Sequence, residues 1–148
     1  MKNGELHTLI DLLERSCLKF PENAYLWEKR EGGYRSVTYR QTRREVGDVA
    51  AGLLAGGLQK GDRVALLSEG CNDWVFAELG ILYAGGVNVP LSIKLTDKEL
   101  IFRVRHSGAR FLIVSDYYVA TLRRIEAELP EIEKIYVIRY SSAEEGKY

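Results

Sequence analysis

Two adjacent glycines in the segment LYAGGVNVPLS (82–92) raise the question of a phosphate-binding loop. Phosphate sites in α/β proteins lie where a strand leads into a helix, because free N–H groups and the positive end of the helix dipole meet the anion there. Gly85 and Gly86 instead follow an apolar helical segment and precede a short apolar run. The chain also contains neither GxGxxG nor GxxxxGK[ST]. We therefore expect the glycine pair to end a helix and to act as a hinge.

The turn LLSEGCNDW (66–74) does run from a predicted strand into a predicted helix. Ser68, Gly70 and Asn72 suit contact with an anion at the start of that helix, whereas Glu69 and Asp73 disfavour a phosphate. Open α/β sheets bind ligands beyond the carboxyl ends of their strands, where this turn would lie. Ligand binding and plain helix capping both stay open. A Ser nucleophile is not indicated, because the G-x-S-x-G frame is missing.

Basic side chains gather near the end of one predicted helix: Arg103, Arg105, His106 and Arg110. Cations there stabilise the helix through its dipole, and contact with a phosphate-bearing ligand is the alternative. His7 and His106 are the only histidines, and their separation predicts neither a metal site nor a catalytic triad. From the residues alone we assign no catalytic, cofactor-binding or metal-ligating group.

The amino-acid composition limits the classes of partner and the cellular compartment that we expect for this chain. Lys plus Arg and Asp plus Glu both number 21, so the charge balance gives no argument for nucleic acid or an acidic membrane as partner. No apolar run approaches the roughly 18 residues of a membrane span. The two cysteines have no metal-ligand spacing, and the N-terminus lacks the features of a signal peptide. These features indicate a reduced, cytoplasmic protein.

Helix and strand signals alternate along the chain. A predicted helix beginning at Leu9, with Thr8 as N-cap, is stopped by Pro21, and a β-hairpin turns at Gly32-Gly33. The further predicted elements are a helix capped by Thr38 and Gln41 and ended by Gly56-Gly57, strand 63–68, a helix from Asn72 as cap to Ala84, strand 87–90, helix 97–107 with the capping box Thr96 and Glu99, strand 109–115, a helix from Ser115 or Asp116 to Leu129, and strand 132–138.

The order from Arg63 onward predicts the fold class. Apolar strands joined by helices indicate an α/β fold, a parallel sheet with helices on both faces, preceded by a helix and a β-hairpin. Residues 1–140 read as one α/β unit, and 141–148 as a polar tail or truncation point.

Two sequence motifs resemble the N-terminal part of the adenylate-forming (AMP-binding) enzymes, which include the acyl-CoA synthetases. Thr38-Tyr39 opens the motif Thr/Ser-Tyr-x-Glu-Leu, although Gln41 and Thr42 replace its last two positions. The motif Leu-Lys-Ala-Gly-x-Ala-Tyr-Val-Pro-Leu-Asp is matched by Leu82, Ala84, Gly85, Val89, Pro90 and Leu91, and departed from at Tyr83, Asn88 and Ser92.

The segments between and after these motifs agree with the same family. They are GLQKGDRVAL (57–66) and LTDKELIFRVRHSGARFLIVSD (95–116), and the resemblance runs from about Leu9 to Ile138. The stretch PLSIKLT followed by FRVRHSGARF resembles bacterial long-chain fatty acid–CoA ligases most.

The resemblance implies a ligase that uses ATP, Mg²⁺ and CoA to convert a long-chain fatty acid into an acyl-adenylate and then acyl-CoA. The family's phosphate loop, adenine-binding segment and catalytic lysine have no counterpart in this sequence. We therefore expect a fragment that is inactive by itself and binds no cofactor. Its first partner would be the remainder of its own chain, and Pro90, Leu91 and Ser92 would lie near the substrate channel.

Other interpretations stay open. Peripheral contact with a membrane and a homodimer contact are compatible with the resemblance. The alternative to a ligase fragment is a free-standing α/β binding or interaction module without catalytic activity. A flavodoxin-like or receiver-like domain is disfavoured, because the sequence shows neither a phosphate-ready first loop nor an acidic cluster after the first strand.

Overall fold

Four parallel strands form the central sheet of the computed structural model, which describes residues 6–30 and 32–138. The strands are β3 (Arg63–Leu67), β4 (Val87–Pro90), β5 (Phe111–Ser115) and β6 (Lys134–Ile138), in the spatial order β4-β3-β5-β6. The two inner strands, β3 and β5, are buried along almost their whole length. Such continuous apolar strands are typical of a parallel sheet that is covered on both faces.

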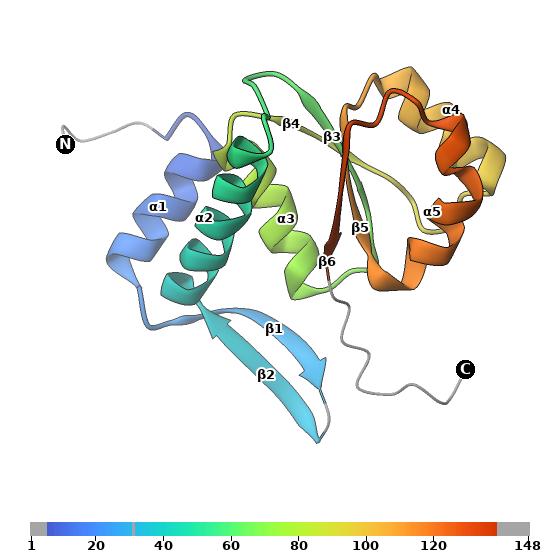
Figure 1. Ribbon diagram of the computed structural model, residues 1–148. Helices are drawn as coiled ribbons and strands as arrows, with labels where there is room; N and C mark the ends of the chain where they lie inside the picture. Colours follow the sequence, from blue (N-terminus) through green and yellow to red (C-terminus); the bar gives the residue numbers. More distant parts are fainter. Residues whose placement is uncertain (1–5, 31, 139–148) are drawn as a thin grey trace.

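Helices cover both faces of this sheet (Figure 1). α2 (Tyr39–Ala55) and α3 (Asn72–Tyr83) cover one face, and α4 (Asp97–Ser107) and α5 (Val119–Ile125) cover the other. α1 (Leu9–Lys19) packs against α2 and α3 rather than on the sheet (Figure 1). Because successive strand residues point to opposite faces, Val64 and Leu66 pack with α2 and α3, whereas Ala65 and Leu67 pack with α4 and α5. The predicted α/β architecture is confirmed.

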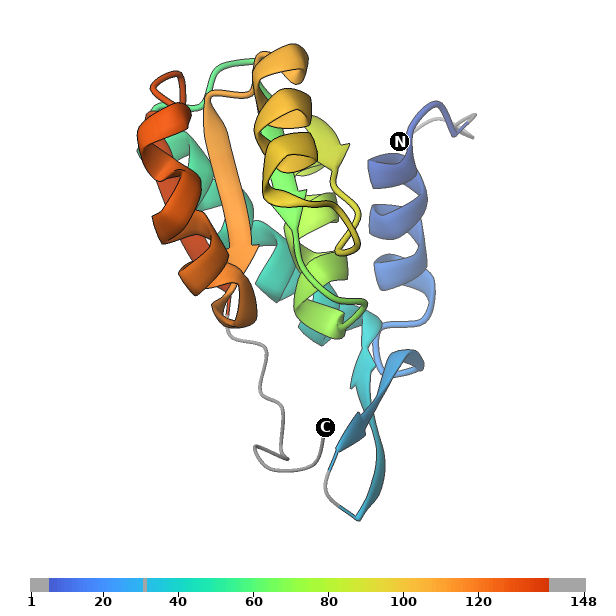
Figure 2. The ribbon, with the colours of Figure 1, turned by 90° about the vertical axis from the view of Figure 1, so that its right-hand side faces the viewer.

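A β-hairpin stands apart from the main sheet (Figure 2). Its strands β1 (Ala24–Arg30) and β2 (Gly33–Thr38) pair antiparallel, as predicted. Gly32 has a φ of +78°, a left-handed conformation that favours glycine in the turn. Leu26 and Val37 pack into a small core with α1, α2 and α3, which holds the base of the hairpin on the body.

Helix starts were predicted correctly where a hydroxyl can serve as the cap. The side chains of Thr8, Thr38 and Thr96 each accept a hydrogen bond from the third residue of the helix that follows. In each case the side chain of that third residue bonds back to the main chain of the threonine, which completes a capping box.

The predicted cap at Asn72 is wrong. Asn72 is the first helical residue of α3, and Cys71, with extended φ and ψ of −146° and 175°, takes the N-cap position. The side chain of Cys71 makes no capping hydrogen bond. The apolar helical pattern located α3 but could not place its first residue, because the turn before it supplies several polar candidates.

The helix predicted from Ser115 or Asp116 to Leu129 is also corrected. The α-helical part covers only α5, between the 3₁₀ turns η1 (Asp116–Tyr118) and η2 (Glu126–Glu128). At both ends the chain tightens into i to i+3 hydrogen bonds: the N–H of Val119 donates to the oxygen of Asp116, and the N–H of Leu129 donates to the oxygen of Glu126. Three smaller differences occur at strand ends: β3 ends one residue earlier than predicted, and β5 and β6 each begin two residues later.

The described residues contain no helix that combines the length and the apolar character needed to cross a bilayer. The tail predicted at 141–148 lies outside the described residues.

Candidate functional site

The carboxyl edge of the sheet is the first candidate site. β3 and β5 are neighbours, but the chain leaves β3 toward α3 on one face and leaves β5 toward α5 on the other. Ligands of open α/β sheets bind at such a switch point. The turn Ser68–Cys71, singled out from the sequence, follows β3 directly at this edge.

Two buried serines and one carboxylate organise this edge. Ser115, which is 0% exposed, donates from Oγ to Oε2 of Glu69 at 2.8 Å. Ser68, 5% exposed, donates from Oγ to the main-chain oxygen of Glu69 at 3.1 Å. The ends of β3 and β5 are thus joined through Glu69. Sequence reasoning missed this contact, although both residues lie directly beyond apolar runs, at the edge where parallel strands end.

The first turn of α3 carries groups that disfavour phosphate. Burial raises the pKa of the Asp73 carboxyl, and the nearby Glu28 carboxylate raises it further. Burial also raises the pKa of the Cys71 thiol, which therefore stays protonated at neutral pH and is a poor nucleophile. Glu69 and Asp73 place two acidic side chains at the helix start, which disfavours an anion there, although the raised pKa of Asp73 favours its neutral form and reduces its share of that repulsion.

Pro90, Leu91 and Ser92 lie at the same edge, at the end of β4. The N–H of Leu91 donates to the oxygen of Leu66 at 2.9 Å, and its side chain is 7% exposed among residues of α4 and α5. Ser92 is exposed, and its Oγ accepts from the N–H of Lys94 at 3.2 Å. Pro90 is exposed beside them. Leu91 therefore anchors this short segment in the core, while Pro90 and Ser92 on either side of it face solvent.

The glycine pair is a helix stop, as predicted. Gly85 has a φ of +81°, and its N–H donates to the oxygen of Leu82 at 3.0 Å. The N–H of Gly86 donates to the oxygen of Ile81 at 2.9 Å. These bonds form a Schellman motif at the carboxyl end of α3, where the helix dipole is negative.

The basic residues near the end of α4 do not form one cluster. Arg110 contacts Asp62 at 2.6 Å and Glu133 at 2.7 Å. Arg105 pairs with Glu131 at 3.1 Å, and the His106 ring stacks on Phe102. Most of these cations therefore have structural partners.

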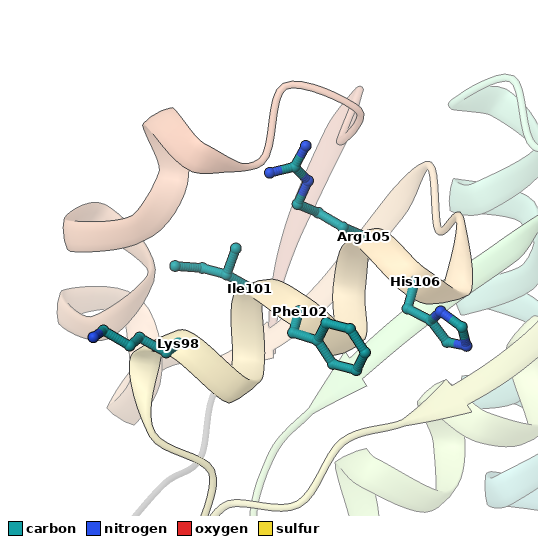
Figure 3. Close-up of a pocket in the computed structure, with 5 residues that line it drawn as sticks. All are labelled: Lys98, Ile101, Phe102, Arg105 and His106. Carbon is teal, nitrogen blue, oxygen red and sulfur yellow. The ribbon is translucent and has the colours of Figure 1, made fainter.

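A shallow pocket of about 470 Å³ lies over α4. Figure 3 shows its lining residues, all from this helix: Lys98, Ile101, Phe102, Arg105 and His106. A second pocket, of about 360 Å³, is lined by residues of α1 and α3 with Thr8. Within the described ranges no three or more His, Cys, Asp or Glu side chains are placed to hold a metal ion.

Comparison with known proteins gives a consistent result. The family model described as AMP-binding enzyme matches residues 13–147. The chain is 30% identical over 107 residues to a crotonobetaine/carnitine–CoA ligase of Citrobacter koseri, covering 72% of this chain and 21% of that protein. It is 26% identical over 122 residues to human acyl-coenzyme A synthetase ACSM2B, mitochondrial, covering 81% and 21%.

A solved structure supports the same relationship. The crystal structure of the anthranilate CoA ligase AuaEII in complex with anthranoyl-AMP superposes with a TM-score of 0.82 at 29% identity. The match covers 89% of this chain and 25% of that chain. The chain therefore spans between a fifth and a quarter of the length of these proteins.

Proposed function

Because the chain belongs to the family of AMP-binding enzymes, we propose that it is the N-terminal part of an ATP-dependent, AMP-forming acyl-CoA ligase. The observation that carries the proposal is the family match over residues 13–147, together with the fold shared with a ligase solved in complex with its acyl-adenylate. Residues 1–140 would form one α/β unit of the larger enzyme.

The proposed reaction has two steps. A carboxylate oxygen attacks the α-phosphorus of ATP, forming an acyl-adenylate and releasing pyrophosphate. The CoA thiol, losing its proton, then attacks the acyl carbon and AMP leaves. Mg²⁺ would offset the phosphate charge. The described residues offer no ligand cluster for it, so we derive no step through Mg²⁺ in this chain.

The contribution of this chain would be the wall of the acyl channel. We propose that Pro90 and Ser92 line that wall and that Leu91 holds them in place against α4, which its burial supports. For the acid itself we propose a long-chain fatty acid, supported by the sequences of residues 90–96 and 102–111. A cytoplasmic location is supported by the free thiols of Cys17 and Cys71.

ATP–pyrophosphate exchange tests the proposal. We expect no exchange from the 148-residue chain with fatty acids, and exchange from a longer product of the same reading frame. Exchange by the short chain would contradict the view that the chemistry requires further residues. A stop codon directly after Tyr148 would instead favour the alternative, a free-standing binding module.

A panel of acids separates the ligase activity from its specificity. The longer product should activate long-chain fatty acids better than short-chain acids or anthranilate. Exchange with short or aromatic acids alone would contradict the long-chain assignment while leaving the ligase proposal intact.

A further inference from the structure

The outer face of α4 combines an exposed aromatic ring with cations. Phe102 is 65% exposed and stacks on His106, with ring centroids 5.5 Å apart and planes 13° apart. Lys98 lies one turn before Phe102, and Arg105 lies nearly one turn after it (Figure 3). The opposite side of the helix, at Leu100 and Val104, is buried in the core. The ring is therefore held at the surface by the fold.

Two of the three acidic side chains described near this face are in ion pairs, and the third, Glu99, keeps its negative charge one turn before Arg103. Asp97 pairs with Arg124 at 3.2 Å, and Glu131 pairs with Arg105. Glu99 accepts the N–H of Thr96 at 2.8 Å in the capping box. Across the part of the chain that the structure describes, no ion pair engages Lys98, Arg103 or His106. With Lys98 and Arg103 set against Glu99, the face keeps an excess of positive charge around its apolar centre.

We propose that this face docks an acidic amphipathic segment of a partner protein. An apolar side chain of the partner would enter the 470 Å³ pocket beside Phe102 and Ile101, and its carboxylates would pair with Lys98 and Arg103. Aromatic side chains and arginine are enriched at protein–protein interfaces. A lipid surface fits less well, because Phe102 is the one large exposed apolar side chain of α4.

A synthetic peptide provides the test. The probe is a fluorescent helix with leucine at positions i, i+3, i+4 and i+7 and glutamate elsewhere, titrated with the 148-residue chain in low salt. A peptide with lysine in place of glutamate is its counterpart. We expect the acidic peptide to bind, the basic peptide to bind at least about tenfold more weakly, and the affinity to fall as salt rises.

Substitutions assign the binding to α4. Phe102→Ala and Lys98→Glu should each weaken binding, by about tenfold for Phe102→Ala. Leu18→Ala, at a leucine of α1 that is 70% exposed, and Lys60→Glu, at an exposed turn residue, are the matched controls and should leave affinity unchanged. Because all four residues are exposed, thermal unfolding should confirm that each variant folds.

Three outcomes would overturn the proposal: equal affinity for both peptides, no effect of Phe102→Ala and Lys98→Glu, or equal loss in the controls. Vesicles with 30% phosphatidylserine form a separate arm. Binding to vesicles that depends on Phe102, without binding to the acidic peptide, would assign the face to lipid instead. The outcomes of the peptide and vesicle experiments do not bear on the proposed ligase activity.

Discussion

Thr42 is a fully buried residue of α2 whose hydroxyl has no hydrogen-bond partner among the described residues. A buried hydroxyl that lost its water without gaining a partner lowers stability. Thr42→Val keeps the shape and removes this cost, so we expect the free energy of unfolding in urea to rise by about 1 kcal/mol. Thr42→Ser keeps the hydroxyl and removes a methyl group, and should destabilise. A destabilised Thr42→Val would show that the hydroxyl is satisfied in solution.

The ion pairs of Arg110 make part of the folding stability depend on pH in the acidic range, where the stability is lost as pH falls. Its side chain lowers the pKa of Glu133. The pKa of Asp62 is lowered first by the N–H of Gln59 and then by Arg110. Since both carboxyls have a lower pKa in the folded state, they contribute stability above their unfolded values of 4.5 and 3.8, and this contribution is lost as pH falls through the folded values.

We therefore expect Arg110→Met to lower stability most near pH 7 and to match the parent chain at strongly acidic pH. The measurement is urea unfolding in steps between pH 2 and 7. Arg123→Met, at an exposed position of α5, is the control and should show no such pH dependence. A constant difference between Arg110→Met and the parent chain at every pH would contradict the ion-pair account.

Individual site residues were only partly predictable. The glycine stop followed from its position after a helix, and the turn after β3 was identified correctly as a carboxyl-edge feature. The contact between Ser115 and Glu69 joins residues 46 positions apart, and only the pairing of β3 with β5 brings them together. The basic residues around Arg105 and Arg110 do not form a free cationic cluster, because folding brings the distant carboxylates of Glu131, Asp62 and Glu133 to them.

At the scale of elements, α2 and α3 approach closely at Gly80. A Cβ on Gly80 would lie 2.5 Å from Cγ1 of Val49 and 3.3 Å from the oxygen of Val46. We expect Gly80→Ala to lower the free energy of unfolding by about 1–3 kcal/mol, because α2 and α3 cannot move apart to make room for the methyl group without opening the core. Gly47→Ala is the matched control within α2, since nothing lies within 4 Å of its Cβ position.

Gly47→Ala should stabilise by about 0.5–1 kcal/mol through helix propensity. Opposite signs for the two substitutions in chemical denaturation would confirm close helix packing at Gly80. Equal gains would show that α3 is free to move away from α2. The sequence could not distinguish these glycines, because both lie inside helical patterns and only the packing of α2 on α3 separates them.

Element prediction succeeded where local chemistry decides the boundary. The hydroxyl caps at Thr8, Thr38 and Thr96 mark their helices because cap and helix are adjacent in the chain. The start of α3 has no side-chain cap, and α5 is flanked by 3₁₀ turns, so neither boundary carries such a local signal. Periodicity found both elements but not their ends.

At the scale of the whole molecule, the strand order β4-β3-β5-β6 carries information that the sequence pattern lacks. Alternating strands and helices predicted a parallel sheet, but not which strands are neighbours. The order places β3 and β5 at the centre and so locates the switch point. At this edge the described side chains contact one another, as Ser115 and Glu69 do, and Leu91 is buried in the core.

Exposed apolar residues on α1 lead to a prediction for the whole chain. Leu9 is 60% and Leu12 48% exposed, and they lie one turn apart beside the pocket lined by Leu82. In a longer protein such a surface would be covered, and we expect the 148-residue chain to cover it by self-association. Sedimentation velocity over a concentration series should show a weight-average mass that rises above that of the monomer.

The double variant Leu9→Gln and Leu12→Gln should shift that series toward monomer. Leu54→Gln, at a residue of α2 that is 53% exposed, removes a comparable side chain elsewhere and should leave association unchanged. Substitutions at such exposed positions change folding stability little, so an altered mass reports the surface rather than the fold. A parent chain that stays monomeric at the highest concentration would contradict the prediction, and equal effects of both variants would place the contact away from α1.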